Sequence, residues 1–148
     1  MSSMSSGARA PQPSSAALSP VRLRAVAVGA ATVAALVVWG IGKAAGAELN
    51  VVQAEGDPAM EVGFAAVAVS ALFSALLGWG VLALLEKFAP ARSLIVWTVL
   101  TSAVALLSLM PVLFSDASTG TKVVLPLAHL AVAAVVIPLM RRSAVSTR

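Results

Sequence analysis

Four long apolar segments limit what this chain can fold into. They cover residues 21–42, 63–85, 94–114 and 123–140, and none contains Lys, Arg, Asp or Glu beyond its first turn. Segments of this length cross the hydrocarbon core of a bilayer as helices, because a helix satisfies its own backbone polar groups without water. The sequence therefore predicts an all-α membrane protein, an antiparallel bundle of four transmembrane helices in up-down-up-down order.

Composition agrees with this architecture and leaves little room for chemistry. Hydrophobic residues make up 59% of the chain and charged residues 11%, which is too apolar for a soluble domain. With no Cys, the chain has no disulfide and no cysteine-ligated metal centre, and it has one His and no Tyr. Nucleotide-binding, zinc-protease and hydrolase motifs are absent from the sequence. We therefore predict no catalytic residues, no cofactor and no metal site.

The distribution of Lys and Arg predicts the orientation in the bacterial plasma membrane. If the N-terminus is cytoplasmic, eight of these residues lie inside and two outside, as the positive-inside rule requires. The eight are Arg9, Arg22, Arg24, Lys87, Arg92, Arg141, Arg142 and Arg148, and the two are Lys43 and Lys122. Both termini are then cytoplasmic. Because these charges lie beside apolar segments, lipid phosphates rather than nucleic acid are their expected partners.

The chain divides into a transmembrane domain and two tails. Residues 1–20 are rich in Ser, Ala and Pro and predict a disordered cytoplasmic tail. Residues 21–142 form the transmembrane domain, and residues 143–148 form a second cytoplasmic tail. An alternative is a signal peptide cleaved after Ala47, but residues 21–42 exceed the usual length of its apolar region, so we expect helix 1 to stay uncleaved.

Helix-end signals occur in the connections. Asp57-Pro58 is typical of a helix start, and it predicts that the second helix begins there. Ser118, Thr119 and Thr121 are candidate caps for the fourth helix. We expect three prolines to lie near helix termini rather than to act as hinges. They are Pro111, Pro126 and Pro138.

His129 is the only ionisable side chain within the predicted spans beyond their first turns, and intramembrane ionisable residues are often functional. Counting about 1.5 Å per residue from Val123 places it roughly 9 Å below the outer boundary. Ser70 and Ser108 lie at matching depth on neighbouring helices and can pair with an imidazole. The cluster His129, Ser70 and Ser108 is either a site that handles protons or a ligand, or a set of hydrogen bonds that joins helices. We expect the second.

Small residues recur along one face of the second helix. Ser70, Ser74 and Gly78 follow at four-residue spacing and form a candidate helix-packing ridge, which we expect to pack within the chain rather than in a dimer. The ring of Trp79 between Gly78 and Gly80 is either packed among the helices or part of a ligand groove, and we expect packing.

The first outer loop holds four acidic residues whose spacing matches no calcium-binding loop. We expect them to form a solvated acidic face. They are Glu48, Glu55, Asp57 and Glu61.

Several short motifs carry a family resemblance. In chain order they are Met60-Glu61-Val62-Gly63, Gly78-Trp79-Gly80, Leu84-Leu85-Glu86, Trp97-Thr98, Thr121-Lys122 and Leu127-Ala128-His129. Over residues 21–142 the chain resembles a domain-of-unknown-function family of small four-helix membrane proteins from high-GC Gram-positive, actinobacterial-type bacteria. The resemblance implies a four-span plasma-membrane protein and no particular activity. Small multidrug transporters resemble the chain less, because they need a membrane-embedded Glu where this chain has Leu36 and Val37.

Two functions remain open from the sequence. The first is an accessory or structural membrane protein that contacts a second copy of itself or a larger membrane complex through its helices. The alternative is a small transporter or proton-coupled carrier that uses His129.

Overall fold

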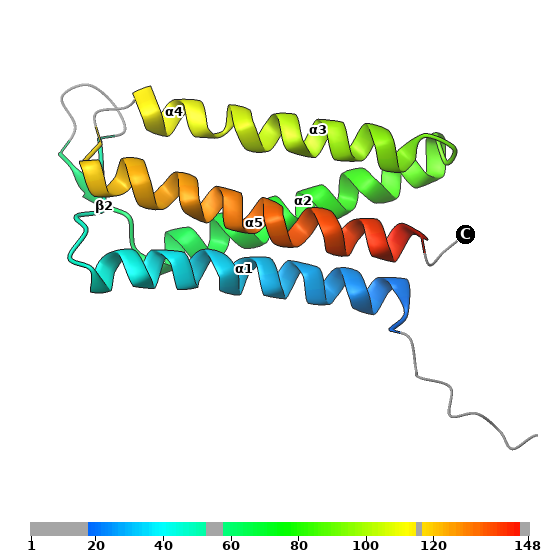
Figure 1. The fold of residues 1–148 in the computed structure, drawn as a ribbon, viewed down its shortest axis with the longest axis horizontal. Helices are drawn as coiled ribbons and strands as arrows, with labels where there is room; N and C mark the ends of the chain where they lie inside the picture. The colour runs from blue at the N-terminus through cyan, green and yellow to red at the C-terminus, as the bar shows by residue number, and fades with distance from the viewer. Residues whose placement is uncertain (1–17, 53–57, 115–116, 146–148) are drawn as a thin grey trace, which may run out of the picture.

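Four long helical segments run side by side along the molecule (Figure 1). The structure is a computed structural model and describes residues 18–52, 58–114 and 117–145. The helices are α1 (Pro20–Ala44), α2 (Phe64–Phe88), α3 (Ser93–Leu107), α4 (Leu109–Phe114) and α5 (Thr119–Val145). Consecutive segments run in opposite directions, with α3 and α4 in one line, and all four segments are long and apolar enough to cross a membrane. The predicted antiparallel four-helix bundle is confirmed.

A small sheet closes one end of the bundle, which we call the sheet end. β1 (Asn50–Val51) pairs antiparallel with β2 (Met60–Glu61), and Val51 also bridges to Ala117. The opposite end holds the start of α1, the connection from α2 to α3 and the end of α5 (Figure 1). We call it the Arg24 end.

The sheet changes where the second helix starts. α2 begins at Phe64 with Gly63 as its N-cap, so the prediction of a start at Asp57-Pro58 is wrong, and Asp57 lies outside the described residues. The chain after Pro58 is instead extended, because its backbone pairs with β1. The capping prediction for the fourth helix is confirmed, since the Ser118 hydroxyl accepts the Thr121 N–H at 3.3 Å.

Proline acts differently in the third and fourth spans. The third span breaks between Leu107 and Leu109, because Pro111 has no N–H to donate to the Leu107 carbonyl and its ring crowds that carbonyl. Pro126 and Pro138 lie well inside α5, so the expectation that they mark helix ends is wrong. α5 is longer than predicted: it begins at Thr119 rather than 123 and ends at Val145 rather than 140.

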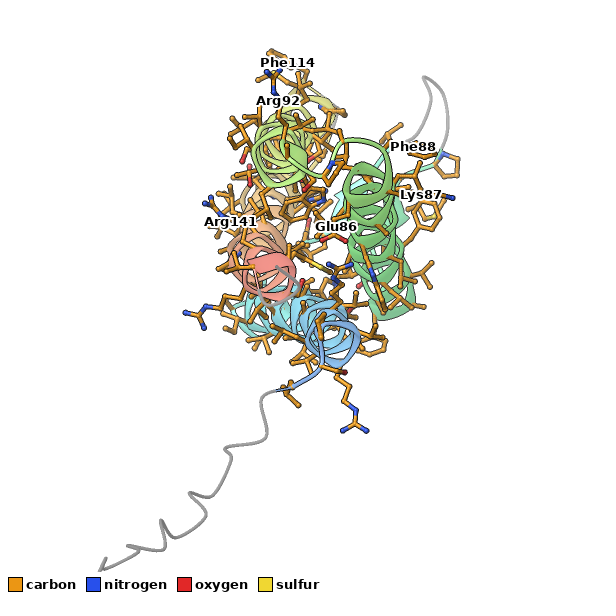
Figure 2. All side chains as sticks on the ribbon, turned by 90° about the vertical axis from the view of Figure 1, so that its right-hand side faces the viewer. Glu86, Lys87, Phe88, Arg92, Phe114 and Arg141 are labelled. Atoms are coloured by element: carbon orange, nitrogen blue, oxygen red, sulfur yellow. The ribbon has the colours of Figure 1, made fainter. Side chains whose placement is uncertain are left out.

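The helices are packed unequally. Viewed from the Arg24 end, α1 lies beside α2 and α5, and α3 lies beside the same two helices on the side opposite α1 (Figure 2). α1 packs closely on both neighbours because Ala27, Ala31 and Ala35 recur every fourth residue and are buried. By contrast, few residues of α2 and α5 approach each other.

Packing also differs along the bundle. Toward the Arg24 end, the core includes the fully buried side chains of Trp97, Leu82 and Met140. Toward the sheet end, the buried cluster contains only Ala35, Ala71 and Ala128. We call these regions the packed half and the hollow half.

Candidate functional site

A cavity of about 270 Å³ occupies the hollow half, between α2, α3 and α5, with α1 behind it. It runs along α2 from Ala66 to Gly78 and along α5 from Val124 to Val136. Each stretch extends over twelve residue steps, which correspond to roughly 18 Å of helix. The cavity is therefore long and narrow, parallel to the helices.

The cavity has a distinct boundary at each end. Near the sheet, Trp39 and Val62 line it, and the indole N–H of Trp39 donates to the Val62 carbonyl at 2.9 Å. Toward the packed half, Trp97 is completely buried, and its indole N–H donates to the carbonyl of Gly78, a lining residue, at 2.8 Å. Each end is thus held by a tryptophan that hydrogen bonds to backbone.

The three residues of the predicted polar cluster all line this one cavity. His129 comes from α5, Ser70 from α2, and Ser108 from the break between α3 and α4. No hydrogen bond joins His129 to either serine within the described part of the chain. Counting residues by depth therefore places the three around one space, without the direct pairing that the sequence led us to expect.

The side chain of His129 is bonded within its own helix. It is exposed, and its Nδ1 lies 2.9 Å from the Leu125 carbonyl oxygen. A carbonyl only accepts, so Nδ1 carries the proton of this bond and Nε2 of the neutral ring keeps a lone pair. In that state Nε2 can accept a hydrogen bond from a molecule in the cavity.

The serines offer hydroxyl groups to the same space. Ser108 donates its hydroxyl proton to the Ala105 carbonyl at 2.8 Å, which helps to satisfy the backbone at the helix break. Its oxygen retains lone pairs for a further donor. Ser70 lines the cavity and is exposed.

The predicted packing ridge also lies on the cavity wall. Ser70 and Ser74 are exposed, and a Cβ added at Gly78 would meet no atom within 4 Å. The buried small residues of this helix are the adjacent Ala71 and Ala75. The structure therefore places Ser70, Ser74 and Gly78 beside open space and gives the close packing to the alanines.

A family profile described as "Family of unknown function (DUF6069)" matches residues 15–146. The chain belongs to this family. No curated protein and no solved structure matches the chain. Membership of the DUF6069 family confirms the expected domain-of-unknown-function family, and its description names no activity.

A second polar site, which sequence analysis missed, lies at the Arg24 end of this DUF6069 chain. Arg24 Nη2 donates to Glu86 Oε1 at 2.6 Å, and its Nε donates to the Ser143 hydroxyl at 2.9 Å. The Arg24 side chain is 9% exposed and that of Glu86 is 29% exposed. Figure 2 shows Glu86 directed between the helices, while Lys87 and Phe88 point away. These contacts join α1, α2 and α5.

A signal for this site is present in the sequence. Arg22 and Arg24 are two residues apart on a helix, so they point to different faces. In the structure Arg22 is exposed and Arg24 is buried. Glu86 is the one acid that the topology prediction places at the same end, and it was the partner to consider.

The sheet end holds exposed charges. Glu48 and Glu61 are exposed, Glu61 forms an ion pair with Lys43, and Glu55 and Asp57 lie outside the described residues. The Ser118 hydroxyl donates to the Glu48 carbonyl, and Thr121 Oγ1 donates to the Asn50 carbonyl at 3.0 Å. The loop after α1 is thereby fixed to the start of α5.

Proposed function

We propose that the protein is a non-enzymatic, multi-pass protein of the bacterial plasma membrane, with both termini in the cytoplasm. The arrangement of charge supports this orientation. Six described basic residues lie at the Arg24 end, and Lys43 and Lys122 lie at the sheet end. The six are Arg22, Arg24, Lys87, Arg92, Arg141 and Arg142. An Ala-rich composition with seven Arg against three Lys agrees with an origin in high-GC Gram-positive bacteria.

Single cysteines test the orientation cleanly, because the chain has no Cys of its own. In intact cells, Glu48→Cys should react with a membrane-impermeant thiol reagent, and Arg92→Cys should react only after the cells are permeabilised. Both side chains are exposed, so burial does not account for a difference. The reverse pattern would overturn the orientation.

We infer that the protein is an accessory component that acts through helix contacts with a second copy or a larger membrane complex. The observation that carries this proposal is the shallow packing of α3. In the most apolar 18 residues of the span Ser93–Val112, only 11% of the residues are buried, against 22% in the corresponding stretch of each other span. Only Ser93 and Trp97 are buried in α3. In a bilayer the hydrophobic effect does not hold helices together, so a helix with few internal contacts gains most from a neighbour's packing.

Crosslinking tests this role. Cysteines at Val99 and Leu106, on the exposed side of α3, should trap a partner or a second copy in membranes. Matched cysteines at Val33 and Val37 on α1, which are also exposed, should trap much less. Purification in mild detergent then distinguishes a homo-oligomer from a complex with another protein. Equal trapping at all four positions would contradict a role for α3.

A small carrier that uses His129 is the second candidate function. It is supported by the placement of His129, Ser70 and Ser108 around one cavity, with Nε2 of the neutral ring able to take a proton. In vesicles with a pH gradient, His129→Gln and His129→Leu should abolish proton-coupled flux equally, because neither side chain titrates. Flux that survives in His129→Gln would exclude this role for the histidine.

A further inference from the structure

We propose that the cavity binds an uncharged amphiphile with one hydrocarbon chain and a hydroxyl group, taken from the surrounding bilayer. This inference goes beyond the accessory role, because it concerns the occupant of the cavity and requires neither a protein partner nor transport. Shape, access and the polar groups of the lining support it in turn.

The shape fits a single chain. The cavity volume of about 270 Å³ exceeds the roughly 150 Å³ of an engineered apolar cavity that binds benzene. Its long axis follows α2 and α5 for roughly 18 Å, at 1.5 Å per residue. Apolar side chains dominate the walls, among them Val67, Val104, Leu125 and Val132. A flexible alkyl chain fills such a space better than a compact ring.

Access is from the side. Ser70, Ser74 and His129 line the cavity and are exposed, although they lie within their helices, six or more residues from the nearest helix end. In a membrane, a lateral opening at these positions faces lipid rather than water. The ligand therefore enters from the bilayer, where amphiphiles are concentrated.

The polar groups select an uncharged hydroxyl. In a neutral imidazole whose Nδ1 donates to Leu125, Nε2 of His129 accepts, as does the Ser108 oxygen, while the Ser70 and Ser74 hydroxyls donate or accept. A ligand hydroxyl does both, so it can satisfy groups on more than one helix. No Lys, Arg, Asp or Glu is among the described residues that line the cavity, so an ionised headgroup would lose solvation without gaining a counter-charge.

Photolabelling of the full chain in phosphatidylcholine vesicles tests this proposal. The probe is a dodecanol with a photoreactive diazirine near the end of its chain, and labelled residues are mapped by mass spectrometry. Label is expected on the lining stretches of α2 and α5. Unlabelled dodecanol should compete about tenfold better than dodecane or dodecanoate at equal membrane concentration, the difference expected from roughly one hydrogen bond. Equal competition by all three would overturn the proposal.

Two lipid sources carry the same chemistry, a free long-chain alcohol and a monoacylglycerol. A twelve-carbon monoacylglycerol is therefore included as a fourth competitor. Competition by either hydroxyl compound supports the site, and the stronger one identifies the source. Failure of both overturns it.

A matched pair of glycine variants links the label to the cavity. Gly78→Leu places a side chain in open space at the lining and should reduce labelling about tenfold by occupying the site. Gly80→Leu lies on the same helix, is equally free of neighbours and is not among the lining residues, so labelling should be unchanged. If Gly78→Leu does not fold, Ser74→Leu replaces it. Folded filling variants that label like the parent chain would refute the site.

His129→Leu provides a test of the polar selection. It should remove most of dodecanol's advantage over dodecane while leaving the chain's fold intact. The accessory role is measured separately by α3 crosslinking, so failure of one proposal is distinguishable from failure of the other. An undiminished preference for dodecanol in His129→Leu would mean that Nε2 does not contact the hydroxyl.

Discussion

The packed half and the hollow half of the bundle differ in how far side chains fill the space between the helices. In the packed half, Trp97, Leu82 and Met140 fill the space between the helices, and Arg24 joins α1 to α2 and α5. In the hollow half, small side chains line a cavity. Toward the sheet end beyond Trp97, alanines and serines make up much of the cavity wall, and their side chains are too short to fill it. Side-chain size therefore decides which half is filled and which half has room for a ligand.

The largest expected effect is the loss of Trp97. Trp97→Ala should cost about 3–5 kcal/mol of unfolding free energy, because it leaves a void in the packed half and removes the bond to Gly78. Trp97→Phe should lose less, because most of the packing remains. Unfolding in mixed SDS micelles measures both. A smaller loss for Trp97→Ala than for Trp79→Ala, a partly buried tryptophan at the same cluster, would contradict the central packing role of Trp97.

Arg24→Ala should cause the next largest loss of unfolding free energy. Breaking a fully buried ion pair costs roughly 3–5 kcal/mol, and the partial exposure of Glu86 reduces the expected loss to about 2–3 kcal/mol. Arg22→Ala, at an exposed position two residues away, should change stability by less than about 0.5 kcal/mol. The same unfolding assay compares them. A double-mutant cycle with Glu86→Gln should show strong coupling for Arg24 and none for Arg22.

Replacing a small residue with Leu should affect stability differently in the two halves. Ala31→Leu adds atoms where the parent residue has no exposed surface, so it should destabilise the bundle by about 1–3 kcal/mol. Ser74→Leu lies on the cavity wall and should change stability by less than about 0.5 kcal/mol. Unfolding in mixed SDS micelles measures both changes. Equal losses of unfolding free energy would show that the hollow half is closed in the membrane.

The smallest expected effect belongs to His129. His129→Leu should cost no more than about 0.6 kcal/mol, since its bond is to the carbonyl of its own helix. In a double-mutant cycle, His129→Leu and Ser70→Ala should be additive within about 0.3–0.5 kcal/mol. Coupling above 1 kcal/mol would mean that the two side chains bond directly in the bilayer.

Features of the fold that depend on local sequence were predictable. Apolar length predicts the four spans, and Ser118 is a cap because its hydroxyl reaches a backbone N–H three residues on. The break at Ser108 follows from Pro111, but the third span was predicted as continuous. The strand at Met60–Glu61 was missed, because its stability comes from pairing with residues nine and eleven positions away.

The candidate site was predictable only in part. Depth counting placed His129, Ser70 and Ser108 at one level, and the structure places all three on one cavity. The cavity itself did not follow, because its walls come from all four spans and depend on how their side chains pack together. Arg24 was assigned only to membrane topology, since its pairing with Glu86 depends on how three helices are rotated.

The hydrogen bonds of Arg24 also set an order of events during synthesis. Glu86 follows Arg24 by 62 residues and Ser143 follows it by 119. At about 5–20 residues per second, the ribosome supplies Ser143 roughly 6–24 s after Arg24. During that interval the guanidinium of the first helix lacks one of its native hydrogen-bond partners. The bundle therefore reaches its final arrangement only when the last helix enters the membrane.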